Sequence, residues 1–234
     1  MYQDLYDEKH KMYVFNPIKK AQEKGHVKRP SSGEYEGGIL CADCDNVLLG
    51  EFETYASKAI YGGALPAKEC PTSENCINQH GVKFTKCENI DYAKFKLFLL
   101  SILWRASISS RPLFNDIDLG EHEEPIRKMI LDRNPGEVSD YPIIFMTYLN
   151  DKSMFKDLVA HPQRRESKSG HTIFVFIIGG MFYQFYMNNP KLKYPDYVLT
   201  ETIKPTNNLN IFHIPIGEGM DVILKYYGIH KPSH

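Results

Sequence analysis

Two cysteines at Cys-x-x-Cys spacing, Cys41 and Cys44, are the residues of this 234-residue chain whose types and spacing most clearly indicate metal binding or reactivity. Thiolates separated by two residues can bind one metal ion, and the free N–H groups of a first helical turn help to hold them. A structural zinc site needs about four ligands. The pair therefore predicts half of a zinc site.

Two other interpretations of the pair stay open. A redox dithiol of the thioredoxin type requires a strand–helix–strand context, whereas a Gly-rich loop precedes Cys41. The second alternative is a pair of unligated thiols in a half-buried turn. We expect metal binding, because Cys-x-x-Cys in a reducing compartment is more often metal-binding or catalytic.

Five cysteines, all before residue 88, make a secreted disulfide framework a poor interpretation, because the number is odd and the distribution is crowded. The N-terminus has no apolar segment typical of a secretory signal, and no run of 18 apolar residues is present. The sequence therefore predicts a cytoplasmic protein with no membrane span.

Basic residues gather in two segments that are candidates for contact with nucleic acid. The net charge is −1, so any such surface must be a local patch. The candidate residues are Lys28, Arg29, Arg164 and Arg165, with Lys19, Lys20, Lys24 and Lys168 beside them in the sequence. These side chains would form a phosphate-facing patch, and the alternative is an ordinary solvated surface.

Helical periodicity indicates the elements that must position these residues. Apolar residues recur at helical spacing from Asp45, and Gly62-Gly63 ends that helix. Residues 91–108 predict a buried helix, and residues 121–131 predict a second helix with acidic residues in its first turn. Residues 64–89 are polar and rich in turn-forming residues, so we expect little regular structure there.

The second half of the chain has the composition of β-strands. Residues 141–149, 171–187 and 208–216 are rich in β-branched and aromatic residues. Gly179-Gly180 divides the second of these runs, either as a hairpin turn or as a bulge. Residues 219–228 predict a C-terminal helix.

The run "GILCADCDNVLLGEFETYASKAI" (38–60) resembles the second half of a treble-clef zinc module in the HNH and endonuclease VII superfamily. It is also similar to a group of bacterial HNH-like proteins in which an apolar helix ends in Trp-Arg, as Leu103-Trp104-Arg105 does here. The resemblance covers residues 10–110. It implies a zinc site that a Cys-x-x-Cys pair upstream completes, yet no cysteine precedes Cys41.

The resemblance leaves the remaining zinc ligands open. They would come from Cys70, Cys76, His80 or Cys87, or from another chain. The remaining alternative is that the ligands are absent and no zinc site forms. The ligand set that we predict is Cys41, Cys44, Cys70 and Cys76.

The resemblance also implies a catalytic site that holds Mg²⁺ or Mn²⁺ against a scissile phosphate. At a comparable spacing to the family's acid-His-x-His run, Glu23 and His26 occupy the outer positions, and Lys24 stands at the general-base position. Asp45, directly after Cys44, matches the metal ligand of the family's helix. The alternative is that Glu23, Lys24 and His26 are solvated loop residues.

These observations predict an α+β protein with a degenerate treble-clef or HNH-like module at residues 1–88. Residues 89–234 would supply a buried central helix and a β-rich C-terminal part with antiparallel strands. The expected function is that of an intracellular bacterial or phage protein that binds zinc and acts on or near DNA or RNA. It would carry a degenerate phosphodiesterase site formed by Glu23, His26 and Asp45. The alternative is a non-catalytic module that binds a protein partner.

Overall fold

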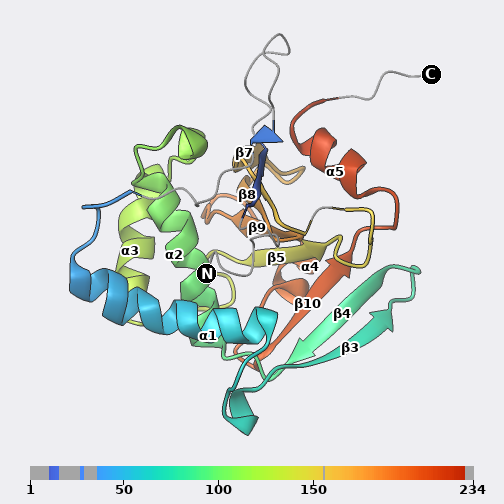
Figure 1. Ribbon diagram of the computed structural model, residues 1–234, viewed down its shortest axis with the longest axis horizontal. Helices are drawn as coiled ribbons and strands as arrows, with labels where there is room; N and C mark the ends of the chain where they lie inside the picture. Colours follow the sequence, from blue (N-terminus) through green and yellow to red (C-terminus); the bar gives the residue numbers. More distant parts are fainter. Residues whose placement is uncertain (1–10, 16–26, 29–35, 155, 230–234) are drawn as a thin grey trace.

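The computed structural model describes residues 11–15, 27–28, 36–154 and 156–229. These residues form a mixed sheet of ten strands with helices on both faces (Figure 1). The predicted α+β class is confirmed.

The sheet follows the order β2-β1-β6-β8-β9-β5-β10-β4-β3, and β7 pairs with β8 outside this path. Its strands are β1 (Tyr13–Phe15), β2 (Val27–Lys28), β3 (Thr72–Ile77), β4 (Lys83–Glu88), β5 (Ile143–Thr147), β6 (Leu158–Ala160), β7 (Gln163–Glu166), β8 (Thr172–Ile178), β9 (Met181–Tyr186) and β10 (Asn208–His213). Two of the pairings are parallel, β1 with β6 and β10 with β5. The sheet thus includes strands from both sides of residue 88.

The helices are α1 (Gly50–Tyr61), α2 (Tyr92–Ser107), α3 (Glu123–Leu131), α4 (Asp196–Glu201) and α5 (Gly219–Tyr226). Figure 1 shows α1, α2 and α3 gathered on one side of the central strands. Side chains of these three helices share one hydrophobic core with the sheet, whereas α4 and α5 contribute to a second core.

Strand alternation explains why the central strands are buried on both faces. Along β8, Phe174 and Phe176 belong to the core under α1–α3. Ile173, Val175 and Ile177 belong to the second core. A continuous apolar run is what a strand between two layers of helices requires.

The expected division of the long apolar run is confirmed as a hairpin. Gly179 and Gly180 have φ values of 61° and 83°, and they join β8 to β9. Two successive positive φ angles are the geometry that glycine adopts without steric cost. A Cβ atom on Gly180 would also lie 2.3 Å from Leu149 Cδ2.

The buried central helix is confirmed as α2, one residue shorter than expected at each end. Its N-cap is Asp91, whose carboxylate Oδ1 accepts from Lys94 N across 2.9 Å. The backbone N–H of Asp91 donates to the hydroxyl of Tyr55 on α1 across 2.7 Å. This cap fixes the start of α2 against α1.

The helix expected from Asp45 begins earlier than predicted. A π-helical segment, Asp43–Leu49, precedes α1, and Asp45 N donates to Cys41 O across 3.0 Å. Cys44 and Asp45 therefore lie in the first turn of the helical segment, and Cys41 lies just before it. Helix α1 ends at Tyr61, and its C-cap is Gly62 with a φ of 86°, as the Gly62-Gly63 pair predicted.

The expectation of little regular structure at residues 64–89 is wrong. β3 and β4 pair over six residues each, and β4 joins the sheet through β10. The strands were missed because most β3 side chains are exposed and polar, so no apolar alternation marks them. Asn78 Oδ1 closes the turn by accepting from the N–H groups of His80 and Val82.

Candidate functional site

Cys41 and Cys44 lie at the start of the helical segment and form a close pair. The backbone N–H of Cys44 donates to Cys41 Sγ, with 3.4 Å between nitrogen and sulfur. Cys41 is exposed and Cys44 is half-buried, and both are free thiols. The pair occupies one helical turn, as the Cys-x-x-Cys spacing predicted.

The pKa values of the two thiols are shifted in opposite directions. The N–H of Cys44 and then the Cys44 thiol donate to Cys41, which lowers the pKa of Cys41. The same thiol–thiol hydrogen bond raises the pKa of Cys44, because ionisation of Cys44 would lose it. Cys41 is therefore the better nucleophile of the pair.

The structure does not bring the other predicted zinc ligands to this pair. Cys76 lies on β3, and Cys70 lies just after the short helical turn Ala67–Glu69. Within the described ranges, no group of three or more His, Cys, Asp or Glu side chains could hold a metal ion. Cys41 and Cys44 alone do not fit a site that requires about four ligands.

Of the predicted catalytic residues, Asp45 is among those that the structure describes. Glu23 and His26 lie outside the described residues, as does Lys24. Asp45 is exposed in the π-helical segment.

The predicted phosphate-facing residues have different environments. Arg29 lies outside the described residues, and of Lys28 only the backbone in β2 is described. Arg164 and Arg165 are neighbours on β7, so their side chains leave opposite faces of the strand. Arg164 is exposed, and its guanidinium Nη2 lies 3.4 Å from Thr172 Oγ1. Arg165 is half-buried near the second core, where it interacts electrostatically with Tyr226 and Tyr227.

A cavity of about 390 Å³ lies between the helices and the β1/β6/β8 side of the sheet. We call it the main cavity. On the helical side, the loop 36–40, the starts of the helical segment and α1, and one face of α2 line it. The turn Pro112–Phe114 and strands β1, β6 and β8 line the rest. Its volume is within the range of roughly 300–1,000 Å³ that small-molecule sites occupy.

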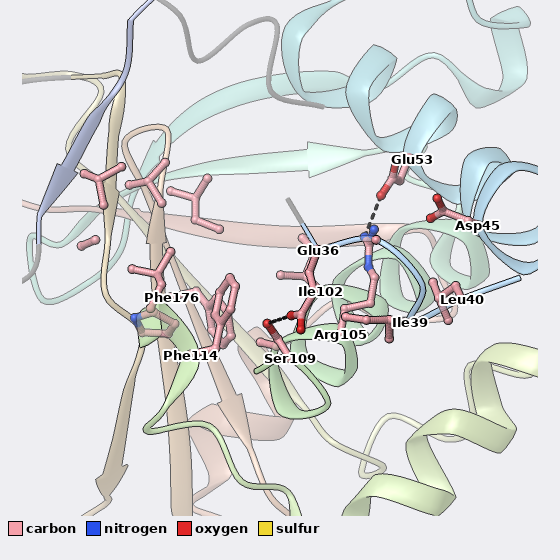
Figure 2. Close-up of a pocket in the computed structure, with 18 of the residues that line it drawn as sticks. Glu36, Ile39, Leu40, Asp45, Glu53, Ile102, Arg105, Ser109, Phe114 and Phe176 are labelled. Carbon is pink, nitrogen blue, oxygen red and sulfur yellow. Dashed lines mark hydrogen bonds and ion pairs between the residues drawn. The ribbon is translucent and has the colours of Figure 1, made fainter. Parts of the chain in front are cut away.

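One end of the main cavity is apolar. Strand and turn side chains form its walls, and Figure 2 shows Phe114 and Phe176 at this end. The apolar lining of the whole cavity comprises Met12, Val14, Ile39, Leu40, Ile102, Ala106, Leu113, Phe114, Val159, Ala160, Pro162, Phe176 and Ile178. Of these, Ile39 and Leu40 lie beside Arg105 at the other end (Figure 2). Such a wall favours a hydrocarbon chain or an apolar ring system.

The other end of the main cavity is charged. Arg105 Nη2 lies 2.6 Å from Glu53 Oε1, and Arg105 Nε donates to Ser101 O across 3.2 Å. Figure 2 shows Asp45 on the same side of the cavity as this pair. The positive charge of Arg105 is therefore already balanced by one carboxylate.

Glu36 is the third carboxylate of the main cavity. Its Oε2 accepts from Ser109 Oγ across 2.6 Å and from Ser110 N across 3.0 Å, and its Oε1 accepts from Ser110 Oγ. The hydrogen bond from Ser109 is the main cause of a pKa lowered below the usual range, so Glu36 is ionised at neutral pH. Dashed lines in Figure 2 mark the contacts of Glu36 and Glu53.

Sequence reasoning missed most of the charged residues of the main cavity. Glu36, Glu53 and Ser109 carry no motif, and their proximity depends on how the loop 36–40 packs beside α1 and α2. For Arg105 the sequence contains one indication, namely a charged residue near the end of a mostly apolar helix. Of the predicted catalytic residues, Asp45 alone lines this cavity within the described part of the chain.

A second cavity, of about 280 Å³, lies on the other side of the loop 36–40. Cys41 and Cys44 line it together with Ile39, Leu40, Leu48, Leu49, Trp104, Arg127, Ile130 and Leu131. Its walls are mostly apolar. Ile39 and Leu40 contact both cavities, so the loop separates the two.

Comparisons of the chain with protein-family models, with curated proteins and with solved structures found no match. Among the described helices, none has the length and apolar character needed to cross a membrane.

Proposed function

We propose that this protein binds a small amphipathic molecule in the main cavity, and that the molecule carries a cationic amine on an apolar chain or ring. The observation that carries this proposal is the division of the cavity into an apolar end and an end with three carboxylates and one guanidinium. Clefts with apolar walls and a few polar groups at one end are typical of ligand sites.

The charge of the ligand's polar group follows from the contacts of the four charged residues. Glu53 already neutralises Arg105 across 2.6 Å, so the guanidinium is a weak attractor for an anion. Glu36 already accepts from Ser109 and Ser110 and interacts with Arg111, so Asp45 is the carboxylate that remains open to a ligand. A carboxylate has about four acceptor positions to offer. An ammonium group, with three donors and a positive charge, satisfies these acceptors.

Calorimetric titration with octylamine, 1-octanol and octanoate tests the proposal, because these probes share a chain and differ in charge. We expect affinities in the order amine, alcohol, carboxylate. Octanoate binding as tightly as octylamine would contradict the proposed charge selectivity.

Two variants assign the binding to the main cavity. Asp45→Asn should weaken octylamine roughly fivefold, the size expected of a partly exposed ion pair, and should leave 1-octanol unchanged. Ala106→Leu adds volume to the apolar wall and should weaken all three probes. Glu74→Gln, an exposed carboxylate on β3, is the matched control and should bind octylamine like the unaltered protein.

Action on nucleic acid is a second proposal, and the location of Asp45 favours it. Its carboxylate follows Cys44 at the start of a helix and lines a cavity with Glu36 and Glu53. The described residues do not complete a metal site, because Arg105 engages Glu53, serines engage Glu36, and no group of three ligands forms among them.

Cleavage of plasmid DNA with Mg²⁺ or Mn²⁺ tests this second proposal. Cleavage that is lost in Asp45→Ala and kept in Glu74→Gln would support it. Absence of both cleavage and DNA binding at low salt would remove it.

A further inference from the structure

The second cavity combines a dithiol with a buried donor that has no partner. Trp104 lines the cavity and is 8% exposed, and no described group accepts from its indole Nε1. A buried donor of this kind is unfavourable unless something accepts from it. The Nε1 atom is itself covered, so a ligand carbonyl in the cavity would satisfy it after a small shift of the indole.

The dithiol faces the same space. Cys41 and Cys44 both line the cavity, and one helical turn separates them. Residues three apart on a helix have Cβ atoms about 5–6 Å apart, and a disulfide needs roughly 3.5–4.5 Å. A small local adjustment therefore allows these two sulfurs to bond.

We propose that Cys41 and Cys44 form a thiol–disulfide exchange site, and that the second cavity binds an apolar residue beside the disulfide of a peptide or protein substrate. The sequence favoured a metal pair over redox chemistry. The geometry favours exchange, because the exposed sulfur, the half-buried sulfur and the apolar cavity lie together without a third ligand among the described residues.

The reaction has two steps that balance without a further reactant. The sulfur of Cys41, as a thiolate, attacks the substrate disulfide, so a mixed disulfide forms and one substrate thiolate leaves. The sulfur of Cys44 then attacks Cys41 Sγ, the Cys41–Cys44 bond forms, and the second substrate thiolate leaves. Two electrons pass from the dithiol to the substrate, and the two thiol protons end on the released thiols.

The lining selects the substrate class. The cavity is walled by leucine and isoleucine side chains. Arg127 is the one cationic residue among the described residues that line it, and Glu124 holds it through contacts of 2.6 and 2.8 Å. An apolar side chain therefore suits the space better than an acidic one. After a small shift of the indole, Trp104 Nε1 would donate to the peptide carbonyl beside that side chain.

Two synthetic probes test the proposal on the full chain, purified reduced and then freed of reductant. They are the symmetric disulfides of N-acetyl-Leu-Cys-amide and of N-acetyl-Asp-Cys-amide. By mass spectrometry, we expect the protein to lose two hydrogens, gain a Cys41–Cys44 link and release two peptide thiols. The Leu probe should react roughly tenfold faster, as burial of an apolar side chain favours it.

Variants identify the role of each residue. Cys44→Ser should stop at a mixed disulfide on Cys41, and Cys70→Ser, at an exposed cysteine elsewhere, should react like the unaltered protein. Trp104→Phe keeps the ring but removes the donor. It should slow the Leu probe roughly fivefold without lowering the denaturation midpoint.

Three outcomes would overturn the proposal. They are a Cys41 that reacts no faster than Cys70, equal rates with the two probes, and a purified protein in which stoichiometric zinc blocks Cys41 and Cys44.

Discussion

Arg105 on α2 and Glu53 on α1 are joined by an ion pair of 2.6 Å at the charged end of the main cavity. Both side chains are about 70% buried, and Arg105 Nε also donates to Ser101 O. The pair therefore links α1 to α2, and it also neutralises the one guanidinium described at the charged end of the main cavity.

Removing either member of this pair should destabilise the protein. Arg105→Met leaves the Glu53 carboxylate without its partner, and Glu53→Gln leaves the guanidinium partly unpaired. We expect each variant to lower the free energy of unfolding by about 1–3 kcal/mol. The double variant should lose less than the sum of the single losses, with a coupling of roughly 1 kcal/mol measured by urea denaturation. Strict additivity would mean that the two side chains act independently.

The hydroxyl of Tyr55 is predicted to hold the start of α2. Its oxygen accepts from the backbone N–H of Asp91. Tyr55→Phe would leave that N–H without this acceptor. We expect a loss of about 1–2 kcal/mol in unfolding free energy. Asp91→Ala, which removes the N-cap acceptor for Lys94 N, should lose about 1 kcal/mol. Losses below about 0.5 kcal/mol in both variants would show that α1 packing alone fixes this helix end.

Lys96 is a buried lysine whose environment disfavours its charge. It is 1% exposed, and its Nζ donates to Tyr92 Oη across 2.9 Å and to Glu137 O across 2.7 Å. Burial lowers its pKa to about 8, although Asp140 and Glu137 oppose this shift. Above pH 8 the unfolded chain therefore keeps a proton that the folded protein has released.

This difference predicts a pH dependence of stability with a definite sign. The unfolded state binds more protons between pH 8 and 10.5, so the Lys96 contribution to the unfolding free energy rises with pH. Cys87 and several tyrosines have raised pKa values and act in the opposite direction. The measurement is therefore the difference between the unaltered protein and Lys96→Met. That difference should rise by roughly 2 kcal/mol between pH 8 and 9.5, and a flat difference would contradict the shift.

The elements that the sequence predicted correctly are those with strong local periodicity. α2 has an apolar stripe and an N-cap, and the β8–β9 hairpin has two β-rich runs around a Gly-Gly pair. Each signal lies within about twenty residues. The β3–β4 hairpin has no such signal, because most β3 side chains are polar and exposed, and β10, which joins β4 to the sheet, lies more than a hundred residues away.

The candidate site could be predicted only in part, for a related reason. The Cys-x-x-Cys pair is local, so its position at a helix start was visible. The contact between Glu36 and Ser109, and that between Glu53 and Arg105, join residues 73 and 52 positions apart. Such contacts follow from the packing of α1, α2 and the sheet, which composition and spacing do not specify.

His171 is predicted to make the protein sensitive to mild acid. Its side chain is fully buried, stacks on Tyr194 with ring centroids 4.5 Å apart, and pairs through Nδ1 with Ser169 Oγ at 3.0 Å. Burial lowers its pKa below the usual 6.5. The unfolded chain therefore gains a proton first as the pH falls below 6.5, so stability present at pH 7 is lost towards pH 5.5.

Replacing this residue separates its titration from that of the other histidines. His171→Phe keeps the stacked ring and removes the charge, so the fall in urea midpoint between pH 7 and 5.5 should become shallower. It should not vanish, because burial also lowers the pKa values of His122 and His213. His80→Gln, in the exposed β3–β4 turn, is the matched control and should leave the slope unchanged. An unchanged slope in His171→Phe would show that His171 takes up its proton equally in the folded and unfolded states.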